Sequence, residues 1–492
     1  MAHEDCFKSI IIGEIFHLST LIVRTSEMSK SRWLVRALIL AAVGIVLAIK
    51  LYFLIFVVDF FIGLYSVVTT GVLFMILLLA YTRFRDPYLA AQEKVVLSNS
   101  KPLVTIIVPA KNEEGIIREC VQACIDSTYQ NKEIIIINDG STDRTTAILD
   151  EMRRNSNITV LHMSKSVGKK KAVKAATDIA KGEIFIMTDS DITIAPDAVE
   201  KTVEIFQSDR AIGAVTAHGR VRGAAQGNAL EKIQDVWYDG QYRIIKGIEG
   251  SFSSLTCCSG AYTAFKKAAV MPFMDRWAND RFAGVDFKFC TDRLMTSFVL
   301  GSGPQAAGKQ ATASRSVSIL ETGDDSIDSM KSTSDPDLEE GKDSPKALWK
   351  VLYSPSIKVL IGPPQTFKSL IKQQIRWRKS FIRSIFATGS VYWKRPLPAA
   401  VIYYLQTGLK ILRPLIVLNA LVLLPLQGDL LSAAFYLSGV LFTGMIYGIE
   451  FRLRNPGNSQ WLYRPVMTLL STFVFSWLLI YAALTIRKST WR

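Results

Sequence analysis

The sequence Ile184-Phe185-Ile186-Met187-Thr188-Asp189-Ser190-Asp191 places two aspartates at the end of a short apolar run. The apolar residues predict a buried strand, with the aspartates at its carboxyl end. Carboxylate oxygens are the ligands that Mg²⁺ and Mn²⁺ prefer, so the pair can hold such a cation against a diphosphate. An Asp-x-Asp pair alone is a weak signal, because similar pairs occur in solvated turns.

Neighbouring apolar runs recur at intervals typical of an α/β domain. We predict strands at Leu103 to Pro109, Glu133 to Asn138, Ile158 to His162 and Glu183 to Asp189. Helical segments separate them, including a lysine-rich one from Lys169 to Lys181, so the alternation predicts a parallel, doubly wound sheet. Ligands bind such sheets beyond the carboxyl ends of the strands, which is where Asp139, Asp189 and Asp191 fall.

Several of these features also have a purely structural interpretation. An Asx turn before the next helix explains Asp139 as well as a ligand contact does. The run Lys169-Lys170-Lys171 could complement a diphosphate, but we favour the commoner case of a solvated helix face. Asn228 to Ile248 fits a helix that lines a groove or one packed in the core. Thr256 to Ala261 permits close approach of a ligand to the backbone, or makes a tight bend in a strand.

Two largely apolar blocks, residues 33 to 82 and 399 to 486, bracket this domain. In the first block we predict spans near Trp33 to Leu51 and Phe60 to Tyr81, with Lys50 and Asp59 marking the hairpin between them. Basic residues flank this pair of spans on both sides, which by the positive-inside rule places the central domain in the cytoplasm.

The second block divides into about three spans. We predict them near Ala399 to Leu426, Leu430 to Phe451 and Val466 to Ile486. Two plus three spans would put the basic tail outside, against the charge rule, unless one span is hidden or broken. Lys410 and Arg413 would either line a polar path through the membrane or snorkel to its surface.

Charge and cysteine usage argue against a nucleic-acid-binding, disulfide-bonded or zinc-binding protein. The chain of 492 residues has a net charge of +15 but no nucleic-acid-binding module, so we expect no nucleic-acid partner and a lipid bilayer instead. The segment Lys368 to Arg395 is basic without a single acid, which predicts an amphipathic helix on anionic headgroups. Six cysteines and four histidines without metal-ligand spacing argue against disulfides and zinc. Nothing resembles a cleavable signal peptide, and Ile10 to Val23 is predicted to be an interfacial helix.

Six motifs occur in order between residues 103 and 381. They are Val108-Pro109-Ala110-Lys111-Asn112-Glu113, Asp139-Gly140-Ser141-Thr142-Asp143, Asp189-Ser190-Asp191, Cys258-Ser259-Gly260, Thr291-Asp292-Arg293 and Gln373-Gln374-Ile375-Arg376-Trp377. In order and spacing they resemble a processive family 2 glycosyltransferase, most like the hyaluronan synthases, with the chitin-oligosaccharide synthases close behind.

The resemblance implies a GT-A fold, which is α/β with a Rossmann-like, mostly parallel sheet, inserted between two membrane blocks. It also implies UDP-sugar donors such as UDP-GlcNAc and UDP-GlcA, a Mg²⁺ or Mn²⁺ cofactor, and inversion at the anomeric carbon. Asp292 would be the general base and Asp191 the metal ligand. The donor nucleotide and diphosphate would contact Asp139, Asp189, Lys169, Gln373 and Arg376. The acceptor end of a growing polysaccharide would contact Trp377, Cys258, Ser259, Gly260 and Arg293.

The chain departs from the family pattern at three places. Hyaluronan synthases usually have Gly-Asp-Asp-Arg where this chain has Cys290-Thr291-Asp292-Arg293, which leaves the identity of the product open. The chain ends in Ser489-Thr490-Trp491-Arg492 instead of a Trp-Gly-Thr pattern. Residues 301–347 are rich in Ser, Gly, Asp and Lys, so we expect a disordered insert, in which Ser318 is a candidate for phosphorylation and an inert linker the simpler explanation.

These observations predict a multi-pass plasma-membrane enzyme that polymerises a UDP-sugar and passes the product through its own spans. The expected segments are 1–32 (interfacial), 33–85 (two spans), 100–300 (GT-A domain), 301–347 (insert), 348–395 (interface helices) and 396–492 (second membrane block). The alternatives are synthesis of chitin oligosaccharide or another β-glycan, transfer of one sugar to a polyprenyl phosphate, and a catalytically silent membrane scaffold.

Overall fold

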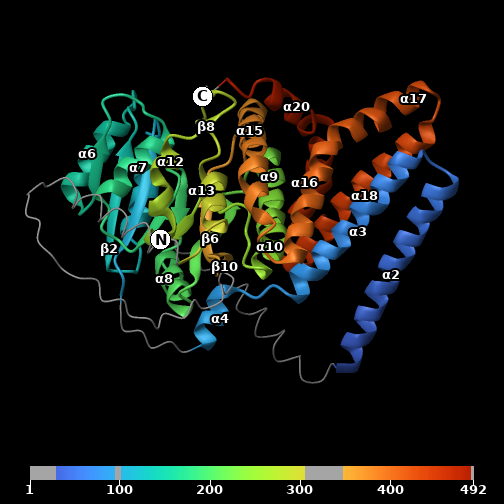
Figure 1. Cartoon of the computed structure of the whole chain (residues 1–492), viewed down its shortest axis with the longest axis horizontal. Helices are drawn as coiled ribbons and strands as arrows, with labels where there is room; N and C mark the ends of the chain where they lie inside the picture. Colours follow the sequence, from blue (N-terminus) through green and yellow to red (C-terminus); the bar gives the residue numbers. More distant parts are fainter. Residues whose placement is uncertain (1–28, 95–100, 305–346, 489–492) are drawn as a thin grey trace, which may run out of the picture.

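The computed structural model describes residues 29–94, 101–304 and 347–488, with side chains from residue 41 onward. An eight-stranded sheet forms one half of the molecule, and a bundle of long apolar helices lies beside it (Figure 1). The strands of this sheet are β1 Val104–Ala110, β2 Lys132–Asn138, β3 Thr159–His162, β4 Ile184–Met187, β5 Ile192–Ile194, β6 Ile212–Val221, β7 Thr263–Lys266 and β10 Lys350–Ile361. A small separate hairpin consists of β8 Arg281–Phe282 and β9 Val285–Asp286. The predicted interfacial helix at 10–23, most of the predicted insert and the C-terminal Trp491 lie outside the described residues.

The first half of the sheet is parallel, as the sequence predicts. The strand order is β3-β2-β1-β4-β7-β6-β10-β5, and β1 pairs in parallel with both β2 and β4. Within β1, Val104, Ile106, Ile107 and Val108 are fully buried. Continuous apolar burial of this kind is typical of a strand that is covered on both faces. The four predicted strands are confirmed as β1 to β4.

The second half of the sheet contains both parallel and antiparallel pairs of strands. The prediction from the sequence, a parallel, doubly wound sheet, includes no antiparallel strand. Strand β7 runs antiparallel to both β4 and β6, and β5 runs antiparallel to β10. The pairing of β10 with β6 shifts register between Tyr353 and Lys358, and such irregularities bend a strand. Since only residues 188–191 connect β4 to β5, the edge strand β5 must lie close to the end of β4.

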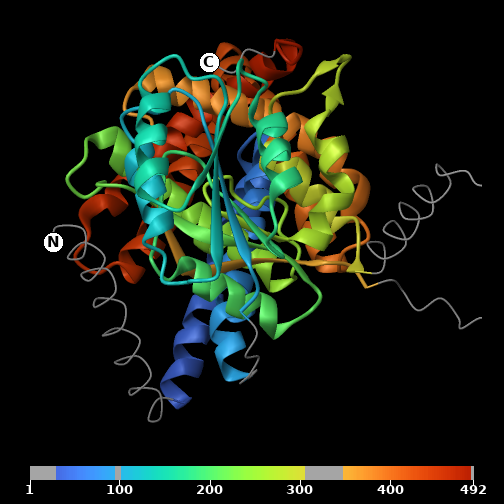
Figure 2. The ribbon, with the colours of Figure 1, turned by 90° about the vertical axis from the view of Figure 1, so that its left-hand side faces the viewer.

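Amphipathic helices cover both faces of the sheet (Figure 2). Helix α7, for example, buries Ala172, Val173 and Ala176, which recur at helical spacing along one side. The helices of this domain are α4 Pro87–Glu93, α5 Ile117–Ile125, α6 Thr145–Asn155, α7 Lys169–Ile179, α8 Ala198–Ser208, α9 Ala229–Gly240, α10 Gly247–Ser251, α11 Lys267–Val270, α12 Met274–Ala278, α13 Thr291–Leu300 and α15 Phe367–Tyr392. A π-helical turn, η1 Gln241–Lys246, joins α9 to α10, and a short 3-10 turn, η2 Met271–Phe273, joins α11 to α12.

The apolar bundle contains α2 Ser29–Phe56, α3 Phe60–Thr82, α16 Leu397–Leu418, α17 Leu424–Leu426 and α18 Leu430–Arg454, followed by α19 Tyr463–Leu470 and α20 Trp477–Leu484. The π-helical turn η3 Asn419–Leu423 joins α16 to α17, η5 Ser471–Phe475 joins α19 to α20, and the 3-10 turn η4 Ser459–Leu462 precedes α19. In the described part of the chain, four helical stretches are long and apolar enough to cross a membrane, namely 60–93, 397–426, 430–454 and 459–484.

Asp59 caps α3 as the predicted hairpin requires, but Lys50 does not mark the hairpin. It lies inside α2, buried, and donates to Ser66 Oγ at 2.6 Å.

The last apolar stretch, 459–484, contacts the sheet domain along its whole length. Its middle packs in a cluster that joins Met467 and Phe475 to Ile233 of α9 and Leu370 of α15. Just beyond its end, the carbonyl oxygen of Lys488 accepts a hydrogen bond from Lys379 Nζ of α15 at 2.7 Å. Both ends of this stretch therefore lie against helices of the sheet domain, while its length and composition fit the predicted third C-terminal span, which stays a prediction.

Helix α15 forms where a basic amphipathic helix is predicted, but it is not only a lipid-facing element. Besides contacting α13 and α20, it places two of its cations against protein partners. Lys379 is buried, and Arg383 pairs with Asp280 at 2.8 Å. Lys368 and Lys372, near its start, are exposed.

Candidate functional site

Asp189 and Asp191 lie in the turn between β4 and β5, at the carboxyl end of the parallel strands. Lys169, at the first position of α7, forms an ion pair with Asp189 Oδ1. Burial alone would lower the pKa of Lys169, but Asp189, with smaller contributions from Asp292 and Asp191, raises it above its ordinary value. The favoured solvated-face interpretation is therefore wrong for Lys169 and holds for Lys171, which is exposed.

The carboxylate of Asp191 is half-buried and lies near other acidic side chains. Burial, together with the charges of Asp189 and Glu113, raises the pKa of Asp191 to about 7. A divalent cation would remove this repulsion, and one or two carboxylates plus substrate phosphates are a common ligand set for Mg²⁺. Among the described residues no three acidic, His or Cys side chains form a complete metal cage. The donor set thus fits a cation that is shared with a diphosphate.

The backbone around Asp191 is held by Arg222, which follows β6. The Nη2 atom of Arg222 donates to the Asp191 carbonyl at 3.1 Å and to Thr193 Oγ1 at 2.6 Å. Its Nε lies 3.2 Å from Glu119 Oε1. Neither Arg222 nor Glu113 is among the site residues predicted from the sequence, although Glu113 belongs to the first of the six motifs.

Asp139 is buried at the end of β2 and is already hydrogen-bonded by the chain. Ser166 Oγ donates to its Oδ2 at 2.8 Å, and the Val167 amide donates to its Oδ1 at 2.7 Å. The Gly168 amide, immediately before α7, donates to both oxygens. Asp139 thus fixes the loop that presents Lys169, while its contact with uridine stays a prediction.

Asp292 lies in the first turn of α13, close to the turn that carries Asp189 and Asp191, which we call the acidic turn. The residue that caps the helix, Cys290, adopts a left-handed conformation with φ 61°. Asp292 lines a pocket of about 390 Å³ together with Lys169, Thr188 and Gly260. The predicted base therefore shares a pocket with Lys169, one of the predicted donor-binding residues.

The turn at Cys258-Ser259-Gly260 leads into β7 and approaches Asp189 closely. A Cβ atom added at Gly260 would lie 3.1 Å from Asp189 Oδ2, which is closer than most Cβ contacts. The backbone at this glycine therefore approaches the carboxylate more closely than a residue with a side chain would allow. Cys258 is fully buried and its amide donates to Thr296 Oγ1, while Ser259 Oγ accepts from Tyr242 at 2.7 Å. Of these three residues, only Gly260 lines one of the two main pockets.

Gln373, Arg376 and Trp377 lie in one turn of α15 beside α9. The indole of Trp377 stacks on Trp237 with ring centroids 5.6 Å apart, and Tyr238 meets it edge-on. Gln373 hydrogen-bonds with Tyr238, but its Oε1 atom is buried without a partner among the described residues. Such an acceptor can be satisfied by a ligand hydroxyl. The sequence predicts the motif, but it does not predict the aromatic stack.

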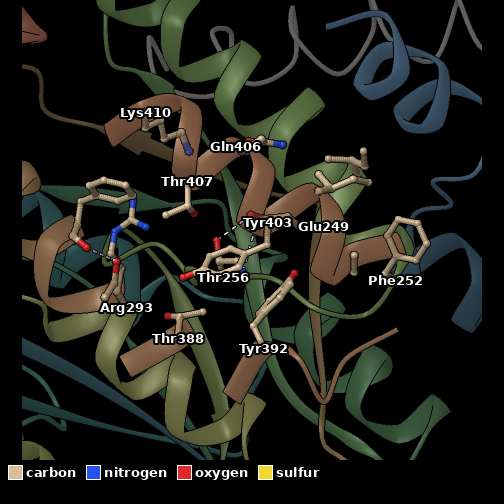
Figure 3. A pocket seen from close by; sticks show the side chains of 15 residues that line it. Glu249, Phe252, Thr256, Arg293, Thr388, Tyr392, Tyr403, Gln406, Thr407 and Lys410 are labelled. Carbon is tan, nitrogen blue, oxygen red and sulfur yellow. Dashed lines mark hydrogen bonds between the residues drawn. The ribbon is translucent and has the colours of Figure 1, made fainter. Parts of the chain in front are cut away.

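A second cavity, of about 530 Å³, begins at Arg293 and extends to α16 of the apolar bundle (Figure 3). Its lining includes Glu249, Thr256, Tyr392, Tyr403, Gln406 and Lys410. Glu249 is oriented by Thr256, whose hydroxyl donates to it at 2.7 Å. Neighbouring residues Asp292 and Arg293 therefore line two different cavities.

Positive charge gathers beside this second cavity. Burial, with the nearby charges of Arg413 and Arg293, lowers the pKa of Arg378 to about 10, and its Nε has no hydrogen-bond partner among the described residues. Lys410 lines the cavity, and Arg413 lies one helical turn further along α16. Buried cations are stable only where anions or hydrogen bonds compensate them.

Comparison with known proteins gives a consistent result. Residues 105–271 match the family model of Glycosyl transferase family 2. Hyaluronan synthase of Streptococcus pyogenes is 22% identical over 395 residues, which cover 79% of this chain and 82% of that protein. An N-acetylglucosaminyltransferase of Rhizobium leguminosarum bv. viciae is 30% identical over 219 residues, or 43% of this chain and 50% of that protein.

Among solved structures, a mannosyltransferase from Pyrobaculum calidifontis in complex with GDP-Man and Mn²⁺ is similar, with a TM-score of 0.47 and 17% sequence identity. The match covers 85% of this chain and 98% of that one. The sequence matches confirm the resemblance drawn from the motifs. Residues 105–271 therefore resemble a family 2 glycosyltransferase domain, and the chain is similar to hyaluronan synthase over most of its length.

Proposed function

We propose that this protein is a membrane-embedded, inverting glycosyltransferase that polymerises UDP-sugars into a β-linked, hyaluronan-like polysaccharide and moves the product across the membrane. The observation that carries the proposal is the position of two consecutive residues. Asp292 lines the pocket beside the acidic turn, whereas Arg293 lines the cavity that reaches α16. Bond formation and the start of a membrane path would then be one residue apart.

The donor UDP-sugar would lie at the carboxyl ends of β1, β2 and β4. Asp189, Asp191 and Lys169 are already gathered there, and Arg376 and Gln373 lie on α15. A bound Mg²⁺ or Mn²⁺ would neutralise charge that grows on the leaving diphosphate. Lys169 supplies a positive charge in the same place, which stabilises the departing UDP further.

The acceptor hydroxyl would attack the anomeric carbon of the donor from the side of Asp292. As the new glycosidic bond forms, the bond from the anomeric carbon to the diphosphate oxygen breaks and UDP leaves with the electron pair. Asp292 takes the proton of the attacking hydroxyl. One displacement of this kind inverts the configuration, which gives a β-linkage from an α-linked donor.

The cations beside the second cavity favour an acidic product. Among the described residues that line the cavity, Arg293 and Lys410 are cations and Glu249 is the one acid, and Arg378 lies close to Arg293. A polymer that contains uronic-acid carboxylates would compensate this charge, whereas neutral chitin would not. This supports UDP-GlcA as one of two donors, with UDP-GlcNAc as the other.

We place the protein in the plasma membrane with its catalytic domain in the cytoplasm, where UDP-sugars are available. The basic residues that flank the first two apolar helices support this orientation.

The test is synthesis by the purified protein in detergent or nanodiscs. We expect polymer only when UDP-GlcNAc and UDP-GlcA are supplied together with Mn²⁺ or Mg²⁺, and digestion of that polymer by a hyaluronan-specific lyase. Polymer from UDP-GlcNAc alone that a chitinase degrades would assign the protein to chitin-oligosaccharide synthesis instead.

The same cations also favour a second candidate, transfer of one sugar to a polyprenyl phosphate. A lipid phosphate could reach Arg293 and Lys410 from the membrane side of the cavity. Adding polyprenyl phosphate to the same reaction separates the two functions, because only this candidate predicts a lipid-linked monosaccharide.

A further inference from the structure

One carboxylate, Asp280, joins three segments around the site. Its Oδ2 accepts from Lys170 Nζ at 2.9 Å, and its Oδ1 accepts from Arg383 Nη2 at 2.8 Å. Lys170 also donates to the carbonyl of Phe287 at 2.9 Å. The side chains of Lys170 and Asp280 are only 5% and 4% exposed, so this is a buried network and not a surface ion pair.

Each of the three segments carries one part of the proposed reaction. Lys170 directly follows Lys169, which pairs with Asp189 on the donor side. Phe287 lies five residues before Asp292, the proposed base. Arg383 lies on α15, less than two turns after Trp377.

Further contacts close the loop between Asp280 and the base. The Phe287 amide donates to the Asp280 carbonyl at 2.8 Å. Trp277, at the end of α12, donates its indole N–H to the Thr291 carbonyl at 2.7 Å. The guanidinium of Arg383 lies over the ring of Phe282 at 5.3 Å. The segment that leads to Asp292 is thus held by hydrogen bonds at Asp280, at Phe287 and at Thr291.

We infer that Lys170 and Asp280 are positioning residues, which set the place of Asp292 relative to the donor side and α15. The inference rests on the proposed function, because it assigns Asp292 the part of the base. Neither residue touches substrate in this assignment. They act by holding the Phe287 carbonyl and Arg383, and a displacement of about 1 Å at a reacting group can cost on the order of 10²-fold in rate.

The alternative is that the network only stabilises the fold. A buried carboxylate that loses one cation is costly in either case, so stability alone does not separate the two roles. The two roles differ in the turnover number of the folded enzyme, since a purely stabilising contact leaves it unchanged well below the melting temperature.

The experiment compares Lys170→Met with Lys171→Met, its exposed neighbour in the same run, and with Lys170→Arg. In Lys170→Met we expect kcat to fall about 10- to 100-fold. The KM for UDP-sugar and the Kd for UDP should stay unchanged, because Lys169 and Asp189 are untouched. Lys170→Arg keeps the charge and should restore most of kcat, while Lys171→Met should behave like the wild-type protein.

A second readout does not depend on turnover. Hydrogen–deuterium exchange of residues 281–292 should rise in Lys170→Met and not in Lys171→Met, measured on the full-length protein in detergent. If the wild-type protein transfers no sugar, the proposed function fails, while this exchange measurement still tests the fastening of the loop. Unchanged exchange in that segment, or normal kcat in folded Lys170→Met, would overturn the inference.

Discussion

The Sγ atom of Cys257 lies 3.4 Å from Oδ2 of Asp292. Burial, with the charge of Asp292 as the next cause, raises the pKa of Cys257 to about 12, so the thiol stays protonated near neutral pH. A weak S–H donor leaves the carboxylate available as a proton acceptor, whereas a lysine or arginine in the same place would compete for it. The proposed base therefore has a partner that can orient it without neutralising it.

The first prediction concerns Asp292→Asn. The amide cannot accept the hydroxyl proton, so sugar transfer should fall by about 10²- to 10⁴-fold. The Kd for UDP, measured by isothermal titration calorimetry, should stay close to that of the wild-type protein, because Asp189, Asp191 and Lys169 are retained. Cys257→Ser, which keeps a donor, is the control and should remain active. A large loss of UDP affinity in Asp292→Asn would instead place this residue on the donor side.

The second prediction uses the close approach of Gly260 to Asp189. An added Cβ at 3.1 Å from Asp189 Oδ2 forces that carboxylate, or the turn, to move by a few tenths of an ångström. Gly260→Ala should therefore weaken Mn²⁺-dependent UDP binding by about tenfold, and Gly260→Val by more, with little change in the melting temperature. Gly115→Ala adds its methyl group into open space and is the matched control. Equal UDP affinity in Gly260→Val and Gly115→Ala would disprove the contact's importance.

The strands and motifs of the first half of the domain could be predicted because they depend on local sequence. A continuous apolar run such as Ile134 to Ile137 gives a buried strand, and the acidic residues that follow β2 and β4 must then meet at one sheet edge. Asp139, Asp189 and Asp191 are all in the expected place for this reason.

Long-range partners could not be predicted in the same way. The Lys170–Asp280 pair joins positions 110 residues apart, and a lysine run at a helix start gives no sign of which member will be buried. The antiparallel strand β7 and the second cavity likewise depend on tertiary packing of segments that are individually ordinary. The packing of the last apolar stretch, 459–484, against α9 and α15 is likewise a long-range feature, whereas its composition indicates a membrane span.

The third prediction is a pH dependence of stability caused by His218 on β6. His218 is buried, with Nδ1 2.8 Å from the Tyr353 hydroxyl and Nε2 3.5 Å from Asp239. Burial, helped by Arg243 and Arg220 and opposed by Asp239, lowers the pKa of His218 to about 4.

Since an unfolded histidine titrates near pH 6.5, the unfolded chain binds more protons than the folded one between about pH 6.5 and 4. Stability should therefore fall as the pH drops through this window, by about 2 kcal/mol at pH 5, and be unaffected by this group above it. Thermal unfolding of wild-type protein and His218→Gln in detergent at pH 7.5 and 5.0 measures the difference. The variant should lose less stability on acidification, and an equal loss in both proteins would contradict the assignment.

The fourth prediction is that the basic C-terminal tail lies on the same side of the membrane as the catalytic domain. The Lys488 carbonyl accepts from Lys379 of α15, and Arg454, before the last apolar stretch, pairs with Asp239 of α9. We expect a helix with both ends on one domain not to cross to the other side. The expected crossings are then α3, α16 and α18 together with α2, of which Ala41–Phe56 is a shorter apolar helix. An even number returns the tail to the cytoplasm, in agreement with its positive charge. An epitope added after Arg492 should be protected from protease in right-side-out vesicles and cleaved in inside-out vesicles, opposite to one inserted between α2 and α3. Cleavage of both epitopes from the same side would mean that the 459–484 helix spans the membrane after all.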